Sequence, residues 1–525
     1  MPTKPNDFEV IPFNEQNLAK ALSNKYLPQT EVSTKKSNHF RYLLSYLSTT
    51  GLAAGTIVIE SPYVSKSFLN DYASYYALCF EPYEKHTKRI HFFQSEFGKR
   101  TFSSAIINPV GPASKKVFGG LNYLGHIVAK PLPEAIIGPT LLRTFQNVQG
   151  RRYTTKPYKI NLFGKKVKFD SLVFQEQDTV VSACATMATW VALHKASRLF
   201  ETTSPTPNQI TSSAGNLFTT SGRSFPNHGL DYHQIGNVLK SVGLVAELRN
   251  KVVVDSNGNH KPQPFDNMFE FRAFLYAYNK IGIPILLGIR QPHGLHLIAM
   301  TGFHIETTAT FLPHAGIRLN AHRIEKIYVH DDQIGPFART KIMATNPDGA
   351  EYELETDLPP DNVNGYQQLI KSQVISAHAV LHPKIRIQFE EVLVEIKNLD
   401  FILRAITQDQ ENYEWDIYLD FSNIYKEELR QLTITGSIKR KPLFSSYPKH
   451  IWVARLRYHG VVVFDIIFDS TAIARSFFCI AINFHFENYI DMYRALMQNA
   501  TFSNAIETRL GQDYIKLFND ELKRY

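Results

Sequence analysis

The sequence is poor in cysteine and in long apolar runs. Its 525 residues contain three cysteines, Cys79, Cys184 and Cys479, too few and too scattered for a disulfide framework. No stretch approaches the roughly 18 uninterrupted apolar residues of a membrane span. The opening residues MPTKPNDFEV lack the apolar core of a signal peptide. We therefore expect a cytoplasmic protein with free thiols and no membrane insertion.

Several features of cofactor-binding and nucleic-acid-binding proteins are also missing. The glycine-rich segment at 119–125 lacks the spacing of a dinucleotide fingerprint, and no phosphate-binding loop occurs. The net charge of +9 is spread over short basic runs, such as 85–89 and 165–168. Runs this short are typical of a solvated surface rather than of a nucleic-acid footprint. We expect no cofactor and no nucleic-acid partner.

The composition is that of a packed multidomain protein. Apolar residues make up 44% and charged residues 20% of a chain longer than one hydrophobic core usually supports. Changes in the apolar pattern predict an α+β fold in three parts: an N-terminal α+β region of unknown role at 1–169, a central domain at 170–385, and a sheet-rich α+β region at 386–525.

Periodicity predicts the elements of the central domain. A helix of small residues should begin near Ser182 and run to Phe200, with Ser182 as its cap. Further predictions are helices at 232–242 and 268–282, a hairpin turning at 257–258, and strands at 283–289, 296–304 and 326–332. After a helix beyond 365, the apolar pattern predicts strands at 382–396, 414–421, 450–469 and 476–484.

Cys184 would lie in the first turn of the small-residue helix. A thiol is a good nucleophile only as the thiolate, which the open backbone N–H groups of a helix start and a nearby imidazolium both favour. A buried, inert cysteine is the alternative, because most free cysteines behave as small apolar residues.

Two later segments support a nucleophile. His296 opens a predicted strand two residues after Gly294, where a base can face a helix end. The next strand ends in two carboxylates, Asp331 and Asp332, before a Gly-Pro turn. A carboxylate there can hold the imidazole in one tautomer, and we expect Asp331 in that role, with Asp332 as the alternative.

The order of these residues resembles the papain-like cysteine peptidase superfamily. In that family a Cys at a helix start is followed by a His on a strand and by an Asn or Asp that ends the next strand. The double-glycine peptidase domains of bacteriocin transporters are most similar, because they use Asp and carry a glycine-bounded helix, as HGLDYHQIGNVLKSVGL does at 228–244. The resemblance covers roughly residues 170–345.

The resemblance implies a bacterial-type thiol hydrolase with a papain-like central domain. Cys184, His296 and Asp331 would form its triad, and Gln177, or else Gln175, would bind the oxyanion. The substrate would be a protein or peptide, cleaved at a peptide or isopeptide bond through an acyl-enzyme; acyl transfer and deamidation stay open, as does the oligomeric state. Since Ala185 replaces the glycine that commonly follows the nucleophile, an inactive peptide-binding or complex-assembly protein is the alternative.

Histidines crowd the segment that carries His296. The others are His293, His304, His314, His322 and His330. Clustered histidines can indicate a metal centre, but their spacing does not favour one, and we expect no metal.

Overall fold

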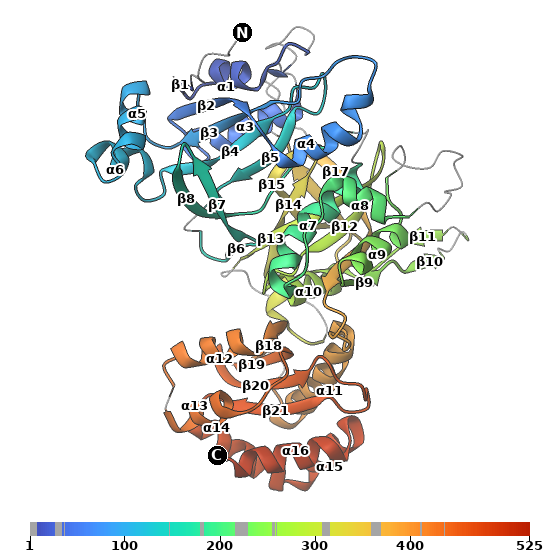
Figure 1. The fold of residues 1–525 in the computed structure, drawn as a ribbon. Helices are drawn as coiled ribbons and strands as arrows, with labels where there is room; N and C mark the ends of the chain where they lie inside the picture. The colour runs from blue at the N-terminus through green and yellow to red at the C-terminus, as the bar shows by residue number, and fades with distance from the viewer. Residues whose placement is uncertain are drawn as a thin grey trace.

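The structure is a computed structural model (Figure 1). It describes residues 8–26, 34–35, 37–145, 148–178, 183–215, 229–254, 258, 260–306, 316–358, 369–409, 412–434 and 436–525. We divide it into an N-terminal section (8–178), a central section (183–381) and a C-terminal section (385–525). Each combines helices and strands, which confirms a mixed α/β chain consistent with the predicted α+β class.

The N-terminal section is built on a five-stranded antiparallel sheet in the order β1-β2-β3-β4-β5. Its elements are β1 (Glu9–Pro12), α1 (Glu15–Leu22), α3 (Asn38–Leu47), β2 (Thr56–Tyr63), α4 (Lys66–Ser74), η1 (Tyr76–Leu78), β3 (Thr87–Phe93), α5 (Lys99–Ile107), α6 (Pro112–Phe118), β4 (Tyr123–Ala129) and β5 (Ile137–Leu142). The aromatic and β-branched composition of β2, β3 and β4 suits a buried sheet. Helices α5 and α6 project from one edge (Figure 1).

The end of this section connects two sheets. Strand β6 (Arg151–Tyr153) pairs with β13 of the central section, whereas β7 (Lys156–Leu162) and β8 (Lys165–Ser171) form a separate hairpin. That hairpin turns through Gly164, whose φ of +86° favours glycine. The predicted domain boundary after residue 169 stays a prediction, but the first section contributes a strand to the central sheet.

The central section is an antiparallel sheet that closes on itself. Strand β12 pairs with both β13 and β17, so β12 to β17 form a ring, with β9 added beside β17. Its elements are α7 (Cys184–Phe200), α8 (Pro207–Ser213), α9 (Tyr232–Ser241), β9 (Val245–Arg249), β10 (Val252–Val254), β11 (His260–Pro262), α10 (Met268–Asn279), β12 (Ile285–Gln291), β13 (Gly294–Ile305), η2 (Asn320–Arg323), β14 (Ile324–Asp331), β15 (Gly335–Ala344), β16 (Tyr352–Asp357) and β17 (Leu369–Leu381).

Helix α7 lies against this ring, mainly along β13 (Figure 1). Small residues on the helix allow a close approach, and its first half, from Ala185 to Leu193, is buried throughout. The predicted hairpin exists as β10 and β11, but its turn at Asn257 lies outside the described residues.

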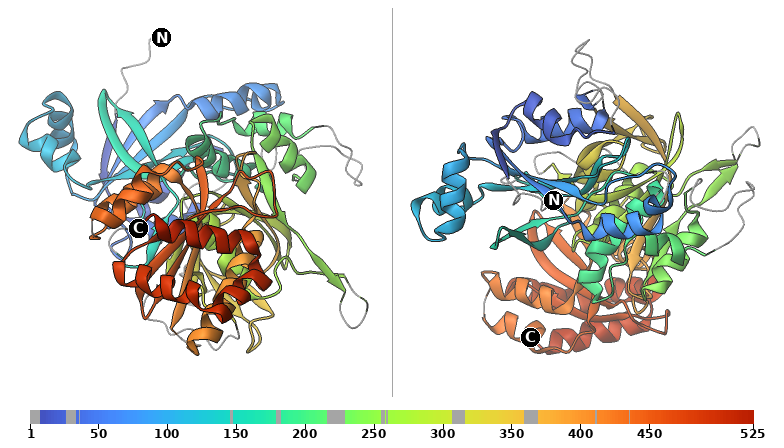
Figure 2. Two further views of the ribbon diagram at one scale, coloured as in Figure 1. Left: turned by 90° about the horizontal axis from the view of Figure 1, so that it is seen from below. Right: turned by 45° about the horizontal axis from the view of Figure 1, so that its top comes forward.

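The C-terminal section is a four-stranded antiparallel sheet, β18-β19-β20-β21, with helices around it (Figure 2). Its elements are α11 (Phe389–Thr407), β18 (Tyr413–Phe421), α12 (Ser422–Gln431), α13 (Gly436–Phe444), β19 (His450–Tyr458), β20 (Val461–Asp469), β21 (Cys479–Phe484), α14 (Glu487–Gln498), α15 (Ala500–Leu510) and α16 (Gln512–Lys523). Successive side chains along β18 point to opposite faces of the sheet, so Trp415 and Asp416 contact different parts of the protein. Trp415 donates to Asp400 of α11 at 2.9 Å, and Asp416 pairs with Lys280 of the central section at 3.1 Å.

Two predicted elements are wrong. The segment 369–381 is strand β17 and not a helix, because pairing with β12, β16 and β9 gives its backbone partners on both sides. The segment predicted as a strand at 382–396 enters helix α11 at Phe389. Its first half reads as alternating, whereas the apolar spacing of three and four residues becomes clear only when the segment is followed to Thr407.

The three sections share one continuous hydrophobic core, which contains buried residues from Leu18 to Leu522. The central and C-terminal sections are further joined by the two-fold pairing of Arg323 with Glu414, at 2.6 and 2.9 Å. In the part of the chain that the structure describes, no helix has the length and apolar character needed to cross a membrane.

The C-terminal section depends on a buried charge network, and its disruption is testable. Asp465 is fully buried and accepts from Arg455 at 2.8 Å, from Tyr425 at 2.9 Å and from His485 at 3.0 Å. Burial opposes ionisation, but the charge of Arg455 outweighs it and holds the pKa of Asp465 well below its usual range. We expect Asp465→Ala to lower the free energy of unfolding by about 3 kcal/mol, because it leaves a buried guanidinium with less compensation.

The matched control is Asp520→Ala, which removes a partner of Lys523 at 3.3 Å on the surface of α16. Exposed pairs contribute about 0.5 kcal/mol or less. Urea unfolding followed by tryptophan fluorescence measures both variants, since Trp415 and Trp452 lie in this section. Equal effects of the two substitutions would contradict the role assigned to Asp465.

Candidate active site

Cys184 is the first residue of α7. Its predicted cap, Ser182, lies outside the described residues, and Ala183 occupies the cap position without a side-chain hydrogen bond. The open N–H groups of the first turn favour negative charge beside them. Cys184 is partly exposed, whereas Cys479 is buried and burial raises the pKa of the Cys479 thiol. Cys184 is therefore accessible where Cys479 is not.

His296 is buried on β13, where it lies opposite Ile289 of β12. Its Nε2 is 2.9 Å from Oδ1 of Asp331, the last residue of β14. The same carboxylate oxygen accepts from the backbone N–H of Gln333 at 2.9 Å, and the N–H of Ile334 donates to the Asp331 carbonyl. This turn fixes the carboxylate, which in turn orients the imidazole.

The imidazole and the thiol meet from two different elements. The Cys184 side chain lies close enough to His296 for a side-chain hydrogen bond that helps to raise the pKa of the imidazole. Nε2 faces Asp331, so Nδ1 is the nitrogen left for the thiol; Nδ1 is buried and makes no hydrogen bond of ordinary geometry with the described residues. The contact between the Cys184 thiol and Nδ1 of His296 is thus looser than the hydrogen bond between Nε2 and Asp331.

The electrostatics of His296 favour the imidazolium. Burial alone would lower its pKa, but the charge and hydrogen bond of Asp331 outweigh burial, and Cys184 and Asp332 act in the same direction, so the pKa rises to about 11. The imidazolium therefore persists through neutral pH, and a cation beside a thiol favours the thiolate.

The second carboxylate, Asp332, lies near His296 without forming a proper hydrogen bond. Its Oδ1 is 3.3 Å from Nε2, yet neither of its carboxylate oxygens has a hydrogen-bond partner of good geometry in the described parts of the chain. Burial raises the pKa of Asp332 to about 7 despite the charge of His296. Of the two acids predicted as orienting residues, Asp331 makes the hydrogen bond.

The two glutamines proposed for the oxyanion differ in their surroundings. Gln177 is half-buried, whereas Gln175 is 2% exposed and both of its amide atoms lack hydrogen-bond partners among the described residues. An unpaired buried amide is costly and is available to a bound group. The role of Gln177 stays a prediction, and Gln175 remains its alternative.

Three of the other histidines in this segment have partners other than Cys184, His296 and Asp331. His304 pairs with Glu325, His322 caps η2 and contacts Phe269, and His330 accepts from the Phe337 N–H; His314 lies outside the described residues. Among the described residues, only His296, Asp331 and Asp332 have ligand atoms close enough together, within 4.8 Å, to hold a metal ion. A metal there would displace the proton that Nε2 shares with Asp331.

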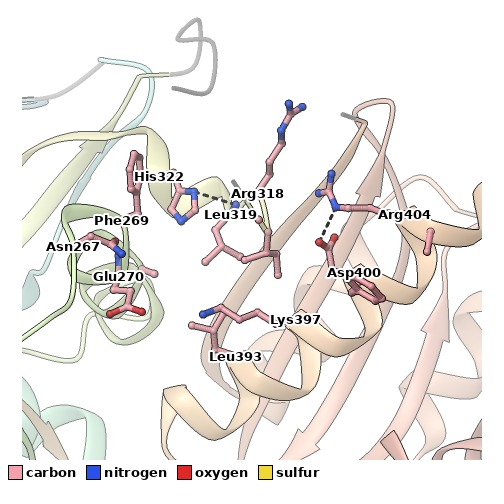
Figure 3. Close-up of a pocket in the computed structure, with 15 residues that line it drawn as sticks. Asn267, Phe269, Glu270, Arg318, Leu319, His322, Leu393, Lys397, Asp400 and Arg404 are labelled. Carbon is pink, nitrogen blue, oxygen red and sulfur yellow. Dashed lines mark hydrogen bonds and ion pairs between the residues drawn. The ribbon is translucent and has the colours of Figure 1, made fainter. Parts of the chain in front are cut away.

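A cavity of about 660 Å³ lies between the central and C-terminal sections, away from these three residues (Figure 3). Its apolar lining includes Phe269 and Leu393, and Arg404 in its wall is held by Asp400 at 2.7 Å. Because Asp400 offsets the charge of Arg404, the lining of this cavity does not indicate a class of ligand.

Comparison of the chain with protein-family models, curated proteins and solved structures found no match. The geometry alone carries the functional argument.

Two residues near the site were missed by sequence reasoning. His39 lies in α3, 293 residues before Asp332, and contacts the Asp332 carbonyl at 2.8 Å. Glu176, between the two candidate glutamines, lies 3.3 Å from the His39 ring. The resemblance covered no residue before about 170, and no local pattern links a helix near residue 40 to a strand end near residue 331.

The two carboxylates should differ in their effects on Cys184. Asp331→Ala removes the main charge that raises the pKa of His296, and a less firmly held imidazolium favours the thiolate less. We therefore expect the alkylation rate of Cys184 near neutral pH to fall about tenfold, because a tenfold change in an equilibrium corresponds to one pKa unit. Asp332→Asn is the matched control, because it keeps the volume and removes no hydrogen bond. Iodoacetamide labelling followed by mass spectrometry measures both; equal losses would contradict the assignment of Asp331.

Proposed function

We propose that the protein is a thiol-dependent hydrolase, a peptidase or isopeptidase, with a papain-like central domain. The observation that carries this proposal is the convergence of Cys184, His296 and Asp331 from a helix start, a strand and the end of the next strand. The 2.9 Å hydrogen bond between His296 and Asp331 and the proximity of the thiol support it. So does a ring of strands packed against the helix that carries Cys184.

The chemistry follows from these positions. The thiolate of Cys184 attacks the substrate carbonyl carbon and forms a C–S bond, while the His296 imidazolium gives its Nδ1 proton to the leaving amine as the C–N bond breaks. Water then attacks the resulting thioester; His296 takes a proton from it, and the carboxylic acid product leaves as the Cys184 thiolate is restored. Asp331 keeps the imidazole oriented in both steps.

The oxyanion that forms in each step needs donors in place beforehand. The backbone N–H of Cys184 would be one, because the first N–H groups of a helix have no partner within the helix itself. The second would be the amide of Gln177, with Gln175 as the alternative. Deamidation or transfer to an amine would use the same acyl-enzyme.

A binding protein that retains this fold without turnover is the second candidate. It is favoured by Ala185, whose Cβ is buried where the related peptidases commonly have glycine. The two candidates differ in whether Cys184 is an activated thiol.

The pH dependence of iodoacetamide labelling at each cysteine tests the proposal without a known substrate. Because His296 keeps its proton until the pH approaches 11, Cys184 should already be labelled near pH 6, about tenfold faster than in His296→Ala, where the thiol needs a pH near 8.5. In the wild type the rate should then vary little through neutral pH. Cys79, which is also partly exposed, is the internal control.

If Cys184 and Cys79 were labelled with the same pH dependence in the wild type, the hydrolase proposal would be wrong and the binding-protein proposal would be favoured. Loss of the fast labelling after treatment with a chelator would indicate a metal at His296, Asp331 and Asp332 instead. Cys184→Ala should unfold at nearly the wild-type temperature, because it removes one partly exposed sulfur atom.

A further inference from the structure

Helix α3 of the N-terminal section lies against the segment that carries the orienting carboxylate. We define the acid loop as residues 331–336. At one point of this loop the carbonyl of Asp332 lies 2.8 Å from Nε2 of His39, and at its end the carbonyl of Pro336 accepts from the Tyr42 hydroxyl at 2.7 Å. Two residues one turn apart on α3 therefore hold the acid loop by its backbone.

The packing between these hydrogen bonds is equally close. Gly335 has φ +156°, and a Cβ added to it would lie 2.3 Å from the Tyr42 ring. Only a glycine permits the helix to come this near. The contact is thus built into the sequence on both sides, by an aromatic residue on α3 and a glycine in the acid loop.

His39 also reaches the segment that leads to the nucleophile. Its Nδ1 is 3.3 Å from Oε1 of Glu176, and Oε2 of Glu176 accepts from the backbone N–H of Ile137 at 3.0 Å. The Glu176 N–H donates in turn to the Ile137 carbonyl. This fastens the residues just before α7 to β5 of the N-terminal sheet.

Both ring nitrogens of His39 face acceptors. A carbonyl oxygen can only accept a hydrogen bond, so Nε2 donates to the Asp332 carbonyl, and the Glu176 carboxylate lies beside Nδ1. The side chains of His39 and Glu176 are only 11% and 17% exposed, which limits competition from water.

We propose that His39 and Tyr42 are positioning residues of the thiol site: they hold the acid loop and the segment before Cys184 in register, so that Asp331, His296 and Cys184 meet. The N-terminal section then completes the active site and is not a separate module for choosing substrates. This inference rests on the function proposed above. Its physical basis is that small displacements of an oriented acid–base pair lower reactivity.

A pair of tyrosines on the same helix provides a matched test. Tyr42 donates to Pro336 of the acid loop, whereas Tyr46, one turn later, donates to the Arg143 carbonyl of the N-terminal section at 2.8 Å. Tyr42→Phe and Tyr46→Phe each remove one hydroxyl–carbonyl hydrogen bond and leave the ring. We expect Tyr42→Phe in the full chain to slow iodoacetamide labelling of Cys184 near neutral pH about fivefold. This is the fold-change that corresponds to the net free energy of one neutral hydrogen bond. Tyr46→Phe should label as the wild type does.

His39 is tested with two substitutions. His39→Ala removes both contacts, and we expect labelling about tenfold slower, with the pH midpoint of labelling moved upward, as for the loss of a supporting hydrogen bond. His39→Gln retains an N–H that can reach the Asp332 carbonyl and should recover most of the rate. A shift of the pH midpoint distinguishes positioning from general destabilisation, which lowers only the unfolding temperature.

The outcomes separate this inference from the proposed function. If wild-type Cys184 is activated and depends on His296, but Tyr42→Phe equals Tyr46→Phe or His39→Ala labels normally, the positioning role is overturned and the hydrolase stands. If wild-type Cys184 is not activated, both fall. Should His39→Ala fail to fold, the tyrosine pair, which keeps both rings packed, decides.

Discussion

The hydrogen bond between His296 and Asp331 is the interaction on which the proposed site depends. Both side chains are nearly fully buried, so each loses hydration that its partner helps to replace. The bond forms because two neighbouring antiparallel strands place an imidazole and a strand-ending carboxylate together, and a turn through Gln333 fixes the acid. With the acid fixed, the imidazole keeps its proton and can hold a thiolate at the start of α7.

The elements that carry the triad could be predicted from the sequence. Helix 184–200 is long and strongly patterned, and strands 294–305 and 324–331 are apolar runs bounded by turns. Reactive residues at the ends of such elements can be recognised in the sequence as candidates, because side chains from different elements can converge where the elements end. The choice of Asp331 over Asp332 agrees with the hydrogen bonding, although both acids lie within 3.3 Å of Nε2.

Contacts between distant segments could not be predicted in this way. Three such contacts join residues far apart in sequence: the pairing of β12 with β17 that closes the sheet, the pairing of β6 with β13, and the contact of His39 with Asp332. Periodicity reports which face of a segment is buried and not which segment buries it. The same limit explains why β17, surrounded by partners, was predicted as a helix.

The two flanking sections relate differently to the site. The N-terminal section contacts the acid loop directly through α3. The C-terminal section contacts the residues around α10 and η2, Arg249 of β9, and Phe200 at the far end of α7 from Cys184. Buried charges such as Asp465 and Arg455 form a paired network within the largely apolar interior of the C-terminal section. Such networks favour one arrangement of the chain over others when every member is paired.

The most direct measurement of the central claim is the ultraviolet difference spectrum of the full chain against Cys184→Ala, which isolates the thiolate of Cys184, recorded as a function of pH. The account predicts a thiolate signal already present well below the pH of about 8.5 at which a free thiol ionises, and lost from that range in His296→Ala. A signal that appears only near that pH, and that is the same with and without His296, would contradict it.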